Sequence, residues 1–492
     1  MRLARCVMVQ GTASDVGKSV IATALCRVLR DEGRDVAPFK AQNMSLNAAV
    51  TPDGHEIARA QAAQAEAAGI PAHVDMSPIL LKPVGDSRSQ LIVRGCARAT
   101  VDARRYWTTR GSLWPVVASS LRSLRARHDV VVIEGAGSPA EMNLRRGDLA
   151  NMRVARHARA PVILVGDIER GGIFAQFVGT LALLGADRER VRALMVNKFR
   201  GDRALFDDGV RWLTRETGLP IAGVLPYSDA LAVPAEDSLA LSSIGRSLRR
   251  GAPVVAVVRY PRISNFDDLD ALSAAGADVR FVRTAADLDG AALVVLPGSK
   301  STIDDLDWLR ASGIAARLPL LVRRGVPVLG LCGGFQMLGT RLADPRGVEG
   351  PARTVEGLGL LPVRTTFEKA KRTAVARGTV ATASALLPAG TGFSGYEIHT
   401  GTTRRSGCRP FATLRRGDGT RVQDGAVSAD GGVVGTYAHG LMETAGVAQT
   451  VLRAIAPNFT PDSASVDRYA ALAQWFRAAV DVPRLWREVG LE

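Results

Sequence analysis

Short apolar runs alternate with helix-like stretches along the first half of the chain. The runs at 6–10 (CVMVQ), 129–135 (DVVVIEG) and 161–167 (PVILVGD) are strand-like, whereas stretches such as 19–32 and 174–184 are helix-like. This alternation is typical of parallel strands joined by crossover helices, and ligands bind such sheets where the strands end. We therefore predict an α/β fold with a parallel sheet, and we expect functional residues just after its strands.

A second series of the same kind begins at residue 253. It includes DVRFVR, AALVVLPGS and VPVLGLCGG, and after residue 341 it gives way to shorter strand-like runs and glycine-rich turns. Between the two series, residues 231–252 mix proline, serine and charged residues, a composition typical of a linker. The chain has 492 residues, enough for more than one core. We predict one domain at 1–230 and another at 253–492, which ends in a helix-like tail.

The first strand leads into a glycine-rich loop, GTASDVGKS at 11–19, which precedes a helix-like stretch. In this setting backbone N–H groups can surround phosphate oxygens, Lys18 can reach the outer phosphates and Ser19 can hold Mg²⁺. Gly11 and Gly17 have five residues between them, one more than the usual phosphate loop has. The loop predicts a nucleotide phosphate site, and an ordinary glycine turn is the alternative.

Three further polar residues, one inside the loop and two at later strand ends, are candidates for contacts with ATP and Mg²⁺. Asp15 lies inside the loop, where it can position a metal or a water, or simply form the turn. Glu134 follows an apolar strand, where a carboxylate can reach the Mg²⁺ of a nucleotide, and a turn or helix-capping acid is the alternative. Asn197 ends another strand, where it can recognise a base or stabilise a turn.

A polar cluster follows the strand-like DVAPF in the stretch FKAQNMSLN. Polar side chains are costly to bury without partners, so such a cluster is more often a binding surface than core. We expect Lys40, Gln42 and Asn43 to contact the substrate or the transferred phosphoryl group, with Lys40 stabilising negative charge. Lys82, which follows another short apolar run, is expected to do the same.

In the second half, Cys332 lies in GLCGGFQ, between an apolar strand and a helix-like stretch. Small residues on both sides allow the sharp turn of a nucleophile elbow, and the start of a helix favours the thiolate. A buried structural cysteine is the alternative. The backbone N–H of Gly333 and those of the turn around Gly298 are candidates to hold an oxyanion.

A nucleophilic cysteine needs a histidine to accept and return a proton. His439 is the best placed candidate, because it follows an apolar strand and precedes a glycine in GGVVGTYAHG. His399, in GYEIHTG, is the second.

The composition narrows the classes of function. The net charge is +15, but the basic residues are spread along the chain and aromatic residues make up 5%, so we do not expect a nucleic-acid partner. No apolar run is long enough to span a membrane, and the N-terminus enters a strand pattern directly. The 5 cysteines form no CxxC pair, which argues against a disulfide framework or a zinc site. We expect a cytoplasmic protein without membrane contact.

The two halves resemble two known families. The second half is similar to class I glutamine amidotransferase domains, whose G-x-C-x-G-x-Q motif matches residues 330–336. The first half is similar to the dethiobiotin-synthetase-like ATPases, whose loop has the same spacing as residues 11–19. This resemblance implies a P-loop-like, parallel-sheet ATPase and amidoligase domain followed by a flavodoxin-like amidotransferase domain.

The order of the halves, with QNMSLN after the loop and GYEIHTG between Cys332 and His439, closely resembles the cobyric acid synthase family of cobalamin biosynthesis. The resemblance covers nearly all of residues 1–445. It implies a glutamine-hydrolysing carbon–nitrogen ligase that uses ATP and Mg²⁺, with L-glutamine as nitrogen donor. Its corrinoid substrate would be adenosylcobyrinic acid a,c-diamide, amidated at the b, d, e and g carboxylates to give adenosylcobyric acid. It implies no particular oligomeric state.

One position departs from the amidotransferase pattern. Typical triads have a glutamate two residues after the histidine, whereas this chain has Leu441 there. The corrinoid-amidating branch is similar in this respect, so a pair of Cys332 and His439 is expected. Glu397 and Glu443 are candidates to orient the histidine, and the third position stays unassigned.

Two other functions remain as alternatives. Cobyrinic acid a,c-diamide synthases join the same two domain types, but the QNMSLN stretch favours the cobyric acid synthase family. A regulatory ATPase of the ParA/MinD kind with a degenerate amidotransferase domain is the alternative from another class. The presence of both Cys332 and His439 argues against it.

Overall fold

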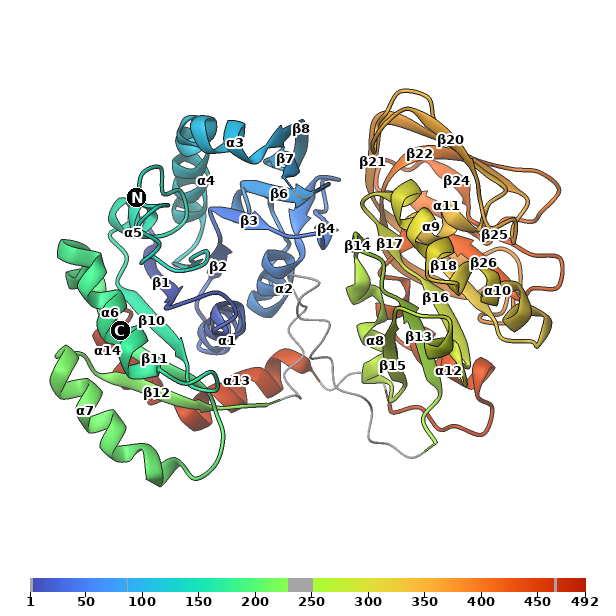
Figure 1. Ribbon diagram of the computed structural model, residues 1–492. Helices are drawn as coiled ribbons and strands as arrows, with labels where there is room; N and C mark the ends of the chain where they lie inside the picture. Colours follow the sequence, from blue (N-terminus) through green and yellow to red (C-terminus); the bar gives the residue numbers. More distant parts are fainter. Residues whose placement is uncertain (1–2, 86, 229–250, 464–466) are drawn as a thin grey trace.

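The computed structural model of the chain describes residues 3–85, 87–228, 251–463 and 467–492. Figure 1 shows two α/β bodies side by side, the first built mainly from the blue to green part of the chain and the second from the yellow to orange part. The linker predicted at 231–252 lies almost entirely outside the described residues. The prediction of two α/β domains is confirmed.

A six-stranded parallel sheet forms the centre of the first domain, in the order β12-β11-β10-β1-β9-β2. Every residue of β9 and β10 is buried, as expected for parallel strands covered by helices on both faces. The strands are β1 (Arg5–Gly11), β2 (Val36–Phe39), β9 (Val130–Glu134), β10 (Val162–Asp167), β11 (Val191–Phe199) and β12 (Ile221–Pro226). The covering helices are α1 (Lys18–Asp31), α2 (Arg59–Ala68), α4 (Trp114–Arg127), α5 (Met152–Ala158), α6 (Ile173–Leu184) and α7 (Asp207–Thr217).

A smaller sheet is inserted between β2 and β9, and it lies on the side of the second domain (Figure 1). Its strands pair in the order β3-β6-β7-β8, next to a short antiparallel pair, β4 and β5. This insertion places β4, which follows the polar stretch, against the second domain. Its elements are β3 (Gln42–Met44), β4 (Ala48–Val50), β5 (Glu56–Ala58), β6 (Ile79–Pro83), β7 (Arg88–Val93), β8 (Cys96–Asp102) and α3 (Ala103–Thr109).

The second domain contains another six-stranded sheet, in the order β15-β13-β16-β18-β26-β25, with β25 antiparallel at the edge. Its strands are β13 (Val254–Val258), β15 (Asp278–Val282), β16 (Leu293–Leu296), β18 (Val328–Leu331), β25 (Ala426–Val427) and β26 (Val433–Thr436). Around it lie α8 (Asp270–Ala274), α9 (Thr302–Ala311), α10 (Ile314–Arg323), α11 (Gly333–Leu338), α12 (Val447–Ile455) and the pair β14 (Ile263–Ser264) and β17 (Gly298–Ser299).

A seven-stranded sheet covers one end of this domain. Two long antiparallel strands, β21 and β22, dominate it and lie on the side of the first domain (Figure 1). The strands are β19 (Arg341–Asp344), β20 (Arg353–Glu356), β21 (Val363–Val380), β22 (Gly392–Arg405), β23 (Ala412–Arg416), β24 (Arg421–Asp424) and β27 (Ala438–His439).

The C-terminal helices α13 (Arg468–Ala479) and α14 (Val482–Glu488) pack on the first domain, although the sequence placed this tail at the end of the second. Leu472 and Phe476 of α13 join the apolar cluster around α1, and Val480 forms an antiparallel bridge with Gly223 of β12. The first domain is therefore built from both ends of the chain. The apolar face of α13 predicts burial but does not identify the domain that covers it.

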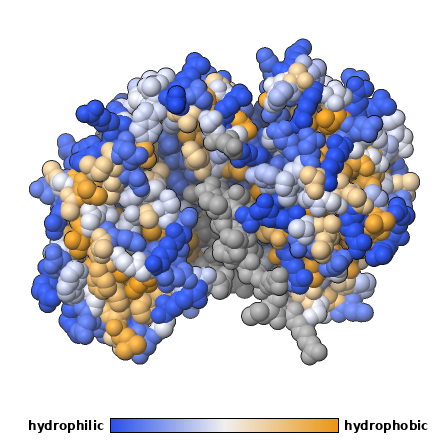
Figure 2. Space-filling view, viewed as in Figure 1, coloured by the Kyte–Doolittle hydropathy of each residue, from blue (hydrophilic) through white to orange (hydrophobic). Residues whose placement is uncertain are grey.

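The domains meet along β4 and β22. Ile398 of β22 packs with Ala48, Ala58, Leu80 and Ile92 of the first domain in one buried cluster. Figure 2 shows that most of the visible surface is hydrophilic, with apolar residues gathered at the lower left of the first domain. Among the described residues we find no helix of the length and apolar character that a membrane crossing requires.

Candidate active sites

The glycine-rich loop joins β1 to α1 in the strand–loop–helix arrangement predicted from its sequence. Gly17 directly precedes α1 and has a φ of 96°, a left-handed conformation that glycine adopts without strain. A Cβ atom at Gly17 would lie 2.1 Å from Nδ2 of Asn197, so the position has no room for a side chain. Asn197 in turn donates a hydrogen bond of 2.8 Å to the carbonyl of Val16. Asn197, on β11, thus stabilises the loop through this hydrogen bond.

The other predicted loop residues lie around the same turn. The Lys18 ammonium donates to the carbonyl of Ala13, 2.9 Å away, so it reaches back across the loop. A Cβ atom at Gly11 would lie 2.5 Å from a neighbouring side chain. Asp15 is exposed, with its carboxylate 3.8 Å from the guanidinium of Arg170. The backbone of the loop is therefore tightly packed, while Asp15 points away from the protein interior.

Glu134, at the end of β9, accepts hydrogen bonds from several polar side chains around the loop. The Ser19 hydroxyl and the Lys40 ammonium each lie 2.8 Å from its Oε1 atom. Gln64 of α2 donates to Oε2 at 2.6 Å, and the amide nitrogen of Gln61 lies 3.5 Å from the same oxygen. The structure thus brings together Ser19, Lys40 and Glu134, which the sequence places far apart.

These contacts keep the buried Glu134 ionised. Burial by itself raises the pKa of this carboxyl, but the charge of Lys40 and hydrogen bonds from Lys40, Gln64 and Ser19 outweigh burial and lower the pKa below its usual value. Mg²⁺ usually binds one or two carboxylates together with phosphate oxygens. The carboxylate and hydroxyl of Glu134 and Ser19 fit an ion that arrives with a nucleotide. In the described part of the chain, no group of three or more His, Cys, Asp or Glu side chains could hold a metal.

Gln42 and Asn43 of β3 are separated by the pleat of their strand. Asn43 donates a hydrogen bond of 3.1 Å to Gln61, which itself faces Glu134. Gln42 instead accepts a hydrogen bond of 2.5 Å from the hydroxyl of Tyr106 in α3. The structure therefore links Asn43 to the phosphate-loop site and gives Gln42 a partner on the smaller sheet.

Lys82 lies at the domain interface, where it pairs with Glu56. Its ammonium is 2.9 Å from Glu56 of β5, and Lys371 of the second domain binds the same carboxylate. Burial raises the pKa of Glu56, but the charges of Lys371 and Lys82 outweigh it and lower the pKa to about 2. Lys82 thus belongs to an ion-pair cluster that joins the two domains.

Cys332 follows β18 and directly precedes α11 in a sharp turn. Its φ of 51° and ψ of −106° are unusual for a residue with a side chain, as expected of a nucleophile elbow. The glycines around it are needed for close packing, since a Cβ atom at Gly334 would lie 1.8 Å from the carbonyl oxygen of Leu296. Cys332 is 9% exposed, and its Sγ lies 3.5 Å from the carbonyl oxygen of Ile398.

His439 lies on β27 between Cys332 and a buried aspartate. Cys332 is near enough to the ring to raise the pKa of the imidazole, and Nδ1 of the ring donates to Oδ2 of Asp268 at 2.6 Å. The other oxygen of Asp268 accepts from the backbone N–H of Gly440 at 2.7 Å. Tyr396 of β22 stacks against the imidazole, with ring centroids 5.4 Å apart. Cysteine, histidine and aspartate therefore form a connected series.

The environment of His439 favours its protonated form. Burial lowers the pKa of the ring, but the charge and hydrogen bond of Asp268, together with Cys332, raise the pKa to about 10. A histidine held in this way between a carboxylate and a thiol can stabilise a thiolate and can return a proton to a leaving group.

Neither acid that the sequence suggested for the third position contacts His439. Glu397 binds Arg416 through two hydrogen bonds of 2.5 and 3.0 Å, and Glu443 accepts from Arg59 at 2.6 Å. Asp268, on the short 3-10 helix η6 (Phe266–Leu269), occupies that position instead. The sequence reasoning missed this residue.

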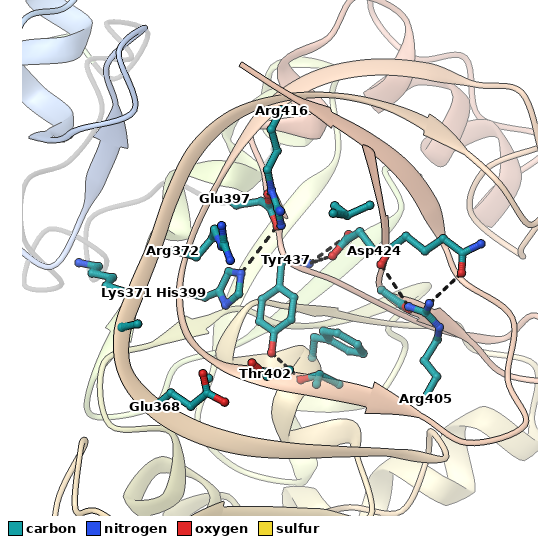
Figure 3. A pocket seen from close by; sticks show the side chains of 17 residues that line it. Glu368, Lys371, Arg372, Glu397, His399, Thr402, Arg405, Arg416, Asp424 and Tyr437 are labelled. Carbon is teal, nitrogen blue, oxygen red and sulfur yellow. Dashed lines mark hydrogen bonds and ion pairs between the residues drawn. The ribbon is translucent and has the colours of Figure 1, made fainter. Parts of the chain in front are cut away.

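His399, the second candidate base, lies on the other side of β22. Its ring stacks on Tyr437 with centroids 3.8 Å apart, and its Nε2 is 3.7 Å from Glu397. Figure 3 shows these three side chains together in a cavity of about 400 Å³ that opens between the strands of the seven-stranded sheet. Alternate residues of a strand point to opposite faces, so His399 faces this cavity while Tyr396 faces His439.

The predicted oxyanion donors lie near the start of α11. A Cβ atom at Gly333 would lie 2.8 Å from the backbone nitrogen of Ser299, so the two main chains approach closely beside Cys332. Gly298 pairs with Ser264 in the short β14–β17 ladder, which fixes the position of this turn. The Ser299 backbone is thus the part of the turn nearest to Gly333.

Two protein-family models match the chain. Residues 7–240 match the CobQ/CobB/MinD/ParA nucleotide binding domain, and residues 254–447 match the CobB/CobQ-like glutamine amidotransferase domain. The first match contains the glycine-rich loop and Glu134. The second contains Asp268, Cys332 and His439.

Similar proteins extend over nearly the whole chain. A cobyric acid synthase from Sorangium cellulosum is 49% identical over 517 residues, which cover 99% of each chain. One from Dehalococcoides mccartyi is 46% identical over 495 residues, with 98% of each chain covered. One from Roseiflexus castenholzii is 50% identical over 440 residues and covers 88% of each chain.

Proposed function

The chain belongs to the cobyric acid synthase family, and from this premise we propose that it amidates the b, d, e and g carboxylates of adenosylcobyrinic acid a,c-diamide to give adenosylcobyric acid. It is a glutamine-hydrolysing ligase with a nucleotide-binding domain and a glutamine amidotransferase domain. The relatives that match almost end to end bear the name of this enzyme, which favours it over a cobyrinic acid a,c-diamide synthase or a regulatory ATPase.

The connected series of Cys332, His439 and Asp268 is the observation that carries the proposal for the second domain. The Cys332 thiolate attacks the side-chain amide carbon of glutamine, and backbone N–H groups near Gly333 stabilise the oxyanion. His439 gives its proton to the departing ammonia. Water then hydrolyses the glutamyl thioester and releases glutamate, while Asp268 keeps the imidazole in the productive orientation.

In the first domain, the phosphate loop and Glu134 support the proposal of an ATP site. Lys18 binds the outer phosphates, and a carboxylate of the corrinoid attacks the γ-phosphorus of ATP to form an acyl phosphate, with ADP as the leaving group. Ammonia from the second domain displaces phosphate from this intermediate and leaves the amide. Lys40 neutralises negative charge beside Glu134. Ser19 and Glu134 would hold Mg²⁺, which neutralises charge on the phosphates when it is bound.

The remaining proposed partners are the corrinoid, glutamine and ATP, and we propose that the protein acts in the cytoplasm. All five cysteines are free in the structure, which fits a reducing compartment. The basic net charge of +15 can attract a substrate that carries several carboxylates.

A product assay tests this function. The protein is incubated with ATP, Mg²⁺ and glutamine and with either cobyrinic acid or adenosylcobyrinic acid a,c-diamide. The masses of the corrinoid products are then measured by mass spectrometry. We expect amidation of the a,c-diamide together with phosphate release. Amidation of cobyrinic acid alone, at the a and c positions, would support the diamide synthase instead.

A further inference from the structure

Helix α2 of the first domain contacts one candidate active site and reaches the turn beside the other. Toward its middle, Gln61 and Gln64 face Glu134 at the phosphate-loop site. Its first residue, Arg59, extends into the second domain although it is only 7% exposed. Because the two glutamines hold α2 against the buried Glu134, the core of the first domain fixes the position of Arg59.

Arg59 is the cation that two carboxylates of the second domain share. Its Nε donates to Asp267 at 2.5 Å and its Nη2 donates to Glu443 at 2.6 Å. Asp267 is buried, and its other oxygen has no hydrogen-bond partner within the described ranges. An unpaired buried carboxylate is costly, so the interaction with Arg59 holds Asp267 in place.

Asp267 is the neighbour of Asp268, the residue that binds His439. Both lie in the short helix η6, and the residue before this helix, Asn265, is also held by the first domain. The side chain of Asn265 makes two hydrogen bonds of 3.3 Å with the backbone of Ala48 in β4. The first domain thus binds this turn at Asn265 and again at Asp267. The next residue, Asp268, orients the histidine.

We propose that Arg59 is a positioning residue for glutamine hydrolysis, supplied to the amidotransferase site by the other domain. It holds the Asp267–Asp268 turn so that Asp268 meets Nδ1 of His439. Glutamine hydrolysis at full rate therefore requires the docked first domain. This inference rests on the proposed function of Cys332 and His439 and adds a residue to it.

The test uses the full-length protein with Arg59→Met. We expect kcat for glutamine hydrolysis to fall by about 10- to 100-fold, the loss that follows removal of the outer partners that orient metal-binding histidines. The KM for glutamine should change little, since Arg59 acts behind the histidine. Amidation driven by ammonium salts should persist, which shows that the fold and the proposed ATP site are intact.

A second variant and a matched control sharpen the test. Arg59→Lys keeps the charge but not the two-pronged geometry, and it should recover part of the lost rate. Arg27→Met removes an arginine that also binds two carboxylates, Asp31 and Asp467, but lies on α1 away from His439. It should leave glutamine hydrolysis unchanged.

A double-mutant cycle decides whether Arg59 acts through Asp268. If it does, Arg59→Met should cause little further loss in a protein that already carries Asp268→Asn. Independent, multiplying losses would overturn the proposal, as would an unchanged kcat in Arg59→Met. If Arg59→Met and Arg59→Lys both abolish ammonium-driven amidation as well as glutamine hydrolysis, Arg59 is required for folding and the positioning role is wrong. If the proposed function itself is wrong, the unaltered protein will not hydrolyse glutamine, and this result differs from all of those above.

Discussion

Oδ2 of Asp268 lies 2.6 Å from Nδ1 of His439, although the two residues are 171 positions apart in the sequence. The carboxylate holds one nitrogen of the ring and leaves the other for proton exchange at Cys332, which is the division of roles that a nucleophile–histidine–acid series requires. Asp268 therefore takes the role of the acid that typical triads have two residues after the histidine, where this chain has Leu441.

Replacing Asp268 by asparagine should therefore impair glutamine hydrolysis. An amide neither carries the charge that supports the imidazolium nor fixes its tautomer, so kcat should fall by up to about 10,000-fold. Amidation with ammonium salts should remain. Glu397→Gln is the control, because Glu397 lies on β22 with its side chain bound to Arg416 and its loss should affect hydrolysis far less. Similar losses in both variants would contradict the assignment of Asp268.

The raised pKa of His439 predicts how stability depends on pH. Its pKa lies near 10 in the folded protein, against 6.5 for an ordinary histidine. The folded state then binds the extra proton, so this contribution is complete below about 6.5 and is lost as the pH rises toward 10. Thermal unfolding followed from pH 7 to 10 should show a falling Tm. In His439→Asn the fall should be smaller, and an equal fall would show that other groups cause it.

Lys18→Ala should separate the two half-reactions. Without the ammonium in the loop, the outer phosphates lose their main cation, so phosphate release and amidation should become undetectable. Hydrolysis of glutamine to glutamate, measured in the same samples, should continue because Cys332 and His439 are untouched. Retained ATP-dependent amidation would show that the loop does not bind the reacting phosphates.

Gly334→Ala tests the packing of the elbow. The added methyl carbon would lie 1.8 Å from a carbonyl oxygen of β16, so the elbow or the strand must move. We expect a loss of about 1–3 kcal/mol or more in the free energy of unfolding, although alanine is otherwise the better helix former. Gly350→Ala is the matched control, since no atom lies within 4 Å of its added carbon. Chemical denaturation measures both, and equal stability would refute the packing argument.

Short sequence patterns predicted those parts of the sites that are built from a few consecutive residues. The loop ending at Lys18 and Ser19 and the elbow at Cys332 are each a strand, a tight turn and a helix within a few residues. Glycines at fixed places reveal them, because the backbone there has no room for side chains. The histidine after β26 was found in the same way.

Contacts between distant segments could not be predicted. Asp268 is one of several acids in its stretch, and only the folding of β14 and η6 brings it to His439. In the same way, Leu472 and Phe476 predict a buried face on α13 but not the domain that it covers. Gln61 and Gln64 did leave a signal, because residues three apart lie on one face of a helix.

The most direct test of the whole account uses Cys332→Ser with two nitrogen sources. We propose that ammonia is released at Cys332 and consumed at the phosphate-loop site. With ATP and adenosylcobyrinic acid a,c-diamide, the variant should form no amide from glutamine but should amidate the corrinoid from ammonium salts at nearly the unaltered rate. A folded variant that still used glutamine, or that lost both activities together, would contradict it.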